Sequence, residues 1–227
     1  MRIDVVIPAL DEEEALPLVL GAIPRPPVRR VVVVDNGSRD GTARVAQAAG
    51  AEVVHEGRRG YGAACQRGLD HLRADPPDVV VFLDGDHSDH PEELPRLLAP
   101  ISTGEADLVV GSRTRGEAED GSLSVPQRVG NGIACLALWA LYRADYTDLG
   151  PFRAIRWSVL EGLGMRDRDY GWTVEMQVRA ARRGVPFAEV PVSYRRRRNG
   201  RSKVSGTLRG TLGASRKILW TLARHVR

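Results

Sequence analysis

Apolar, β-branched runs alternate with helix-compatible segments over roughly the first half of the chain, and this alternation limits the possible folds more than any other feature. The strand-like runs are residues 3–7, 31–34, 79–83 and 108–110. The helix-compatible segments are residues 12–21, 40–49, 60–73 and 92–98. Runs that are apolar throughout are typical of strands buried on both faces. The alternation therefore predicts a doubly wound α/β fold, with a mostly parallel sheet flanked by helices.

The second half of the chain follows a different pattern. Residues 114–124 are polar and rich in glycine, so we expect a loop there. The elements expected after this loop are an apolar helix at 129–142, a turn at 148–151 leading into 152–155, a helix at 173–183 and a strand at 187–194. Because Pro186 and Pro191 flank or interrupt the last of these, we expect it at an edge of the sheet.

Length and cysteine content narrow the class of protein. A chain of 227 residues suits one domain with a short appendage, which we expect to be residues 1–206 and a basic amphipathic helix at 207–227. Cys65 and Cys135 are the only cysteines, a pattern that fits neither a disulfide framework nor a zinc site. No signal-peptide pattern and no apolar stretch of about 18 residues occurs, so we expect a cytoplasmic protein that is not integral to the membrane.

Positive charge gathers near the C-terminus, although the formal net charge is only +4. Glu189 is the last acidic residue, and four consecutive arginines follow at 195–198. Phosphates, membrane headgroups and nucleic acid are all anionic partners that suit such a cluster. We expect one or two of these four arginines to contact phosphate.

The triplet Asp84-Gly85-Asp86 follows a buried strand and is the strongest chemical signal. Two carboxylates in this position can hold Mg²⁺ or Mn²⁺ against a diphosphate, and Gly85 lets the backbone approach the ligand. The metal would neutralise the charge that develops on a leaving diphosphate. The alternative is a solvated turn in which an aspartate caps the helix that starts near residue 92.

The loops after the first two strands should lie beside this triplet, because the carboxyl ends of parallel strands form the ligand crevice. They are residues 8–12 and 35–40. Asp35 ends its strand and can accept hydrogen bonds from a nucleobase or ribose. Ser38 and Asp40 suit a structural role in a turn and helix cap.

Eight motifs, in chain order, resemble the family 2 glycosyltransferases, and within them the dolichyl- or polyprenyl-phosphate mannose and glucose synthase branch. They are PALDEE, VVVDNGSRDGT, RRGYGAACQRGLDH, VVFLDGDHSDHPEEL, DLVVGSR, DLGPFRAIR, GWTVEMQVRAARRG and VPVSYRRRRNGRSKVSGT. The resemblance covers nearly the whole chain. It implies a GT-A-type, Rossmann-like fold, a UDP- or GDP-sugar donor, a divalent metal and inversion at the anomeric carbon.

The resemblance also assigns residues. It implies that Pro8, Leu10 and Glu12 line the nucleoside pocket, that Asp35 binds the base or ribose, and that Asp84 and Asp86 bracket the diphosphate and metal. Arg113 and the Arg201-Ser202-Lys203 turn match positions that meet donor or acceptor phosphates. Two positions depart from the pattern, since Ser88 stands where many relatives have glutamine and Asn36 replaces a commoner aspartate.

Asp148 and Glu175 are the remaining acidic candidates for the catalytic centre. A hydroxyl acceptor requires a general base, and the motif places Glu175 for that role, with Asp148 positioning the acceptor. A phosphate monoester is already an anionic nucleophile and requires none. The structural alternative for Glu175 is a salt bridge to Arg179, four residues further on.

The leading functional hypothesis is transfer of a hexose to a polyprenyl phosphate. The apolar segment 129–142 and the basic tail could then dock peripherally on an anionic membrane. With a small soluble acceptor, the same apolar residues would be ordinary core or a homodimer interface.

Other classes fit less well. A sugar-phosphate nucleotidyltransferase should carry a glycine-rich basic loop after its first strand, and residues 8–12 lack one. An aspartate-nucleophile phosphatase should carry its motif on the first strand. We expect no nucleic-acid partner, because Tyr194 and Trp220 offer no stacking platform in the basic segment.

Overall fold

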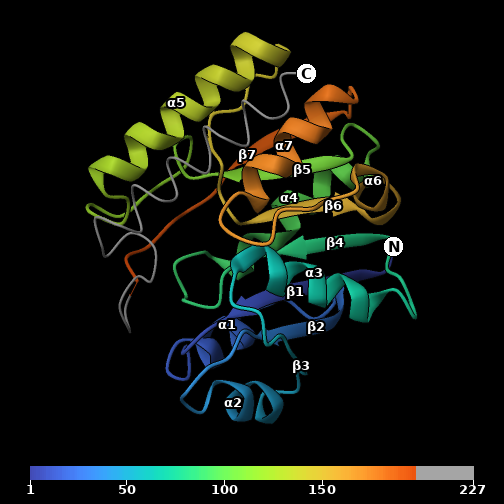
Figure 1. Cartoon of the computed structure of the whole chain (residues 1–227), viewed down its shortest axis with the longest axis vertical. Helices are drawn as coiled ribbons and strands as arrows, with labels where there is room; N and C mark the ends of the chain where they lie inside the picture. Colours follow the sequence, from blue (N-terminus) through green and yellow to red (C-terminus); the bar gives the residue numbers. More distant parts are fainter. Residues whose placement is uncertain (198–227) are drawn as a thin grey trace.

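The computed structural model describes residues 1–197, and a seven-stranded sheet forms its centre (Figure 1). The strand order is β3-β2-β1-β4-β6-β5-β7. The strands are β1 Ile3–Ala9, β2 Val28–Asp35, β3 Glu52–His55, β4 Val79–Phe82, β5 Leu108–Ser112, β6 Arg153–Arg156 and β7 Phe187–Pro191. All neighbouring pairs are parallel except those of β6, which is antiparallel to both β4 and β5. The predicted α/β fold with a mostly parallel sheet is confirmed.

Helices cover both faces of the sheet because successive side chains of a strand point to opposite sides. Val5 and Ile7 of β1 pack in one apolar core with α1, α2 and α4, whereas Val6 packs in the other with α3, α5, α6 and α7. The helices are α1 Leu16–Ala22, α2 Thr42–Ala48, α3 Tyr61–Leu72, α4 Leu94–Ser102, α5 Val125–Tyr142, α6 Trp157–Leu163 and α7 Trp172–Arg182, with a 3-10 turn η1 at Pro91–Glu93.

Four elements differ from the sequence-based expectation. β3 and α6 were not predicted, because four and seven residues respectively give little periodicity to detect. β6 was expected only as a continuation of a turn, yet it inserts antiparallel between β4 and β5. α5 begins at Val125 rather than residue 129, since Gln127 Oε1 accepts a hydrogen bond from the Ser124 N–H (2.8 Å) and stabilises the first turn.

The C-terminal part of the described chain confirms one further prediction. β7 pairs only with β5 and lies at an edge of the sheet, as its flanking prolines indicated. The predicted helix at 207–227, the domain boundary at 206, and the candidate residues Ser202 and Lys203 lie outside the described residues. None of the helices within residues 1–197 combines the length and the apolarity that a membrane crossing requires.

Candidate functional site

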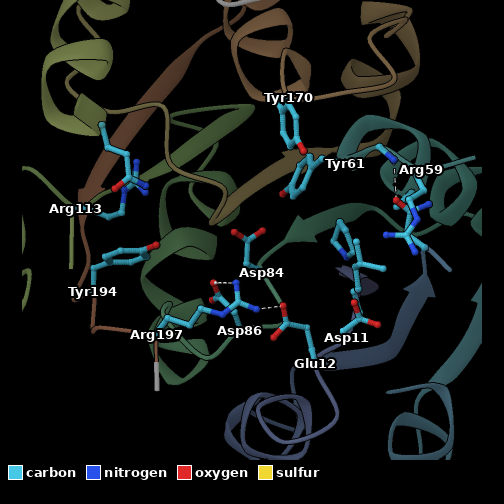
Figure 2. Close-up of a pocket in the computed structure, with 18 residues that line it drawn as sticks. Asp11, Glu12, Arg59, Tyr61, Asp84, Asp86, Arg113, Tyr170, Tyr194 and Arg197 are labelled. Atoms are coloured by element: carbon cyan, nitrogen blue, oxygen red, sulfur yellow. Dashed lines mark hydrogen bonds and ion pairs between the residues drawn. The ribbon is translucent and has the colours of Figure 1, made fainter. Parts of the chain in front are cut away.

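A cavity of about 530 Å³ opens at the carboxyl ends of β1 and β4, the edge where α/β sheets hold their ligands (Figure 2). The predicted site residues that line it are Pro8, Leu10, Glu12, Asp84, Gly85, Asp86 and Arg113. Asp35, Asp148 and Glu175 are not among its lining residues. The structure thus brings most of the predicted set together around one cavity and leaves these three carboxylates behind its walls.

The loop after β1 is held in place by the loop after β2. Asp11 has a left-handed backbone conformation (φ 51°), its N–H donates to Ser38 Oγ (3.0 Å), and its carboxylate accepts from the Arg39 N–H (2.7 Å). The Glu12 N–H donates to Thr42 Oγ1 (2.8 Å). Ser38 therefore has the structural role that its place in a turn predicted, and these contacts fix the β1 loop along the cavity.

Asp35 ends β2 and is buried. One carboxylate oxygen accepts from the Ser38 N–H (2.9 Å), and the other pairs with His55 Nδ1 (3.1 Å). Asn36 lines the cavity beside it, and its Oδ1 accepts from the Gly60 N–H (2.8 Å) while its amide donates to two carbonyls of the same loop. Asn36, one of the two departures from the family pattern, thus ties the loop before α3 to the end of β2.

Three carboxylates crowd the loop after β4. Asp84 and Asp86 were predicted, whereas Asp89 was missed, although it is a third aspartate only three residues beyond Asp86. The Asp84 N–H donates to Asp89 Oδ2 (3.3 Å), and the Ser88 N–H donates to Asp86 Oδ1 (3.0 Å). Burial, reinforced by the neighbouring carboxylates, raises the pKa of Asp84 well above its usual value and the pKa of Asp89 to about 7.

This loop has the donor chemistry that a hard divalent cation requires. A buried oxygen of Asp84 and one of Asp89 have no hydrogen-bond partner among the described residues, and the carboxylates repel one another without a cation. Within residues 1–197, no group of three or more His, Cys, Asp or Glu side chains is arranged to hold a metal. One or two carboxylates of this loop, with phosphate oxygens completing the ligands, have the donor chemistry that a hard divalent cation such as Mg²⁺ or Mn²⁺ prefers.

Arginines of the C-terminal basic segment meet this acidic loop. Arg197 lines the cavity, forms an ion pair with Glu12, and places Nη1 3.6 Å from Asp86 Oδ2 (Figure 2). Arg195 Nη2 lies 3.5 Å from a carboxylate oxygen of Glu92. Although no acidic residue stands near these arginines in the sequence, the fold supplies acidic partners from distant positions.

Arg113 forms the other cationic part of the wall. Asp148 Oδ2 accepts from its backbone N–H (2.7 Å) and from Nε (2.8 Å), while Oδ1 accepts from Nη2 (2.7 Å). Burial opposes the charge, yet the hydrogen bonds to Asp148 outweigh it and raise the pKa of Arg113 above its usual value. The guanidinium also lies over the Tyr194 ring, 5.0 Å from its centroid. Asp148 is fully buried and acts on the cavity through Arg113.

Glu175 lies in the first turn of α7 and is also buried. One oxygen accepts from the N–H groups of Arg166 (2.9 Å) and Asp167 (2.6 Å), and the other accepts from Arg179 Nε (2.8 Å). The salt bridge to Arg179, which the helical spacing offered as the structural alternative for Glu175, is present. The Glu175 carboxylate therefore fixes the backbone of residues 166–167, in the segment before α7.

That segment shapes the cavity through close backbone contact with α3. The Gly62 N–H donates to the Asp169 carbonyl (3.1 Å), and a Cβ at either Gly60 or Gly62 would collide with backbone carbonyls of residues 167–168. Tyr61 and Tyr170 consequently both line the cavity and approach each other (Figure 2). Glycines on both sides of an aromatic residue were the available signal in the sequence.

Comparison with known proteins places this site in a family context. Residues 4–164 match the family model described as Glycosyl transferase family 2. An uncharacterized glycosyltransferase of Mycobacterium tuberculosis is 43% identical over 212 residues, covering 92% of this chain and 93% of that protein. The undecaprenyl-phosphate mannosyltransferase of Micrococcus luteus is 36% identical over 228 residues, covering 92% of this chain and 90% of that protein.

A solved structure has a similar fold over nearly the whole chain. The glucosyl-3-phosphoglycerate synthase of Mycobacterium tuberculosis, crystallised with Mn²⁺, uridine-diphosphate-glucose and phosphoglyceric acid, matches with a TM-score of 0.77 and 28% sequence identity. The match covers 99% of this chain and 79% of that one.

Proposed function

The chain belongs to glycosyl transferase family 2, and from that premise we propose that it transfers a hexose from a UDP- or GDP-sugar to a polyprenyl phosphate. The observation that carries the proposal is the cavity at the carboxyl ends of β1 and β4, where the Asp84–Asp86 loop meets the guanidinium groups of Arg113 and Arg197. Paired carboxylates beside cations suit a metal-bound diphosphate.

The donor would bind across the β1 and β4 loops. Pro8 and Leu10 offer an apolar surface to the nucleoside, and Glu12 a carboxylate, all along the cavity wall. Asp84 and Asp86 would hold Mg²⁺ or Mn²⁺, which would neutralise charge on the leaving diphosphate. The Mn²⁺ and uridine-diphosphate-glucose in the related synthase structure support this arrangement. That Asp35 reads the base or ribose stays a prediction.

An acceptor that is already an anion is consistent with the contacts of Asp148 and Glu175, both of which are bound to arginines. Asp148 holds Arg113, and Glu175 holds Arg179 and two backbone N–H groups, so neither carboxylate lines the cavity as a general base. A phosphate monoester needs no base, and the Arg113 guanidinium in the cavity wall would bind its negatively charged oxygens. A hydroxyl acceptor would instead require one of these two carboxylates to be released from its arginine.

The outer face of α5 supports a lipid acceptor. Val125, Val129, Ile133, Leu136 and Trp139 recur every three or four residues, and from 48% to 73% of each residue is exposed. The first turn of the same helix contributes Gln127 to the cavity lining. Figure 1 shows α5 along one side of the molecule, at the opposite end of the sheet from β3. Peripheral contact of this face with a bilayer would bring the cavity to a lipid-borne phosphate.

A small soluble acceptor is the second candidate. The related synthase was crystallised with phosphoglyceric acid, which is a soluble phosphate monoester. The exposed face of α5 would then be an interface between two copies of this chain.

The deciding experiment supplies radiolabelled UDP- and GDP-hexoses with Mn²⁺ to the protein. Polyprenyl phosphate in detergent and 3-phosphoglycerate serve as alternative acceptors. We expect label in the lipid fraction and none in the soluble product. Label confined to the soluble product would establish the second candidate, and no transfer from any donor would contradict the proposal.

A further inference from the structure

The short turn at residues 147–150 contains Asp148, and residues of four other elements form hydrogen bonds with its backbone. Thr147 and Asp148 both donate their N–H groups to the Glu189 carboxylate of β7, at 2.9 and 3.1 Å, and Thr147 Oγ1 donates to the same group (2.7 Å). Gln177 Nε2 of α7 donates to the Asp148 carbonyl (2.9 Å). A turn with this many buried polar contacts has little freedom to move.

Asn131 of α5 binds the turn from a third element. Its Oδ1 accepts from the Leu149 N–H and its Nδ2 donates to the Thr147 carbonyl, both at 2.9 Å. The fully buried Arg153 of β6 donates to the carbonyls of Leu149 (3.1 Å) and Gly150 (3.1 Å from Nε). Four separate elements thus converge on four consecutive residues.

No residue of the 147–150 turn lines the cavity, but Arg113, which Asp148 holds, does. Three of its N–H groups are committed to Asp148, while Nη1 has no hydrogen-bond partner within residues 1–197. Because the guanidinium is planar, two hydrogen bonds to one carboxylate fix the direction in which its remaining N–H groups point. Its placement therefore depends on the placement of Asp148.

We propose that Asn131, Gln177 and Glu189 are positioning residues, which act through the 147–150 turn and Asp148 to fix the Arg113 guanidinium in the cavity wall. That Arg113 receives the acceptor phosphate rests on the proposed function; that it is held in this way does not. Because Asn131 belongs to α5, it also connects the helix with the apolar outer face to Arg113.

A first test measures how firmly Asp148 holds the Arg113 side chain, and it requires no acceptor substrate. In ¹⁵N-labelled protein, the Nε–H of Arg113 should exchange slowly with water, because it donates to a buried carboxylate. Asn131→Ala and Glu189→Leu should each speed this exchange about tenfold, the factor expected for losing one or two buried hydrogen bonds. Glu189→Gln, which retains an acceptor oxygen, should restore slow exchange, and Gln47→Ala on α2 should leave it unchanged. Unchanged exchange in a folded Asn131→Ala protein would overturn the proposal.

A second test is a double-mutant cycle on kcat/KM for polyprenyl phosphate. Asn131→Ala should lower this value about tenfold in the wild-type background and have no further effect once Arg113→Met is present, because the two act in series. Equal losses in both backgrounds would indicate a general structural role and contradict the positioning role. If Arg113→Met itself left the acceptor kcat/KM unchanged, the proposed function of Arg113 would fail, while the exchange measurement would still decide how it is held.

Discussion

Arg197 Nη1 lies 3.6 Å from Asp86 Oδ2, so a cation of the C-terminal basic segment contacts the acidic loop that follows β4. The same guanidinium pairs with Glu12 of the β1 loop. The contact joins segments 111 residues apart, since 197 minus 86 is 111. Two strand-end loops and the basic segment therefore share one electrostatic network at the cavity.

Asp86→Ala should abolish sugar transfer and leave the fold intact. The side chain is partly exposed, and its described contacts are the Ser88 N–H and Arg197, so the stability loss should be about 1 kcal/mol. Radiolabel transfer and thermal unfolding measured on the same preparation check this. The matched control is Glu105→Ala, an exposed carboxylate outside the cavity. Full activity in the Asp86 variant would remove the acidic loop from the site.

Arg197→Met should raise the KM for the nucleotide sugar about tenfold, since a charge-assisted hydrogen bond contributes about 1.5–3 kcal/mol. Its neighbour gives the control, because Arg196 contacts the 119–120 loop rather than the cavity. Arg196→Met should change the donor KM less than twofold. Similar KM increases in both variants would attribute the effect to net charge and not to position.

Leu136→Glu on the outer face of α5 should abolish sedimentation of the protein with anionic lipid vesicles. A charge at an exposed apolar position removes favourable transfer into the interface without disturbing the core. Transfer to polyprenyl phosphate in vesicles should fall with it, while nucleotide binding stays normal. Leu18→Glu on α1 is the control, because Leu18 is 47% exposed and lies on another helix. Equal vesicle binding by both variants and wild type would point to a soluble acceptor.

The two cysteines should resist thiol reagents in the native protein. Burial raises the pKa of the Cys135 thiol to about 12 and raises that of Cys65 well above its usual value. The thiolate is the reactive form, so at pH 8 almost none is available, and reactivity should rise only as pH approaches the raised values or as the protein unfolds. Labelling with a chromogenic disulfide before and after adding denaturant measures this. Rapid labelling at pH 8 without denaturant would contradict the burial of both thiols.

The parts of the cavity wall that lie at strand ends could be predicted from the sequence. Asp84 and Asp86 follow a run that is apolar throughout, and the parallel sheet then brings the β1 loop beside them. The Glu175–Arg179 pair could be considered in advance as an alternative, because the two residues are four positions apart on a helix. These features depend on local periodicity and on one rule of sheet topology.

Other features depend on pairing between remote segments. Arg113 and Asp148 are 35 positions apart, and they meet because β6 inserts antiparallel beside β5. Neither the direction nor the neighbours of a four-residue strand can be read from its composition. For the same reason, the sequence indicated Asp148 as a candidate acid but not that Arg113 would occupy its carboxylate.

On the proposed function, a nucleoside diphosphate binds at the acidic loop together with a divalent metal. Thermal unfolding with UDP and with GDP, each with and without Mn²⁺, tests it most directly. One nucleotide at a hundred times its Kd should stabilise the protein by about 2.7 kcal/mol in the presence of Mn²⁺, and this should disappear in Asp86→Ala. No stabilisation by either nucleotide with Mn²⁺, or equal stabilisation of the wild type and the Asp86 variant, would contradict the claim.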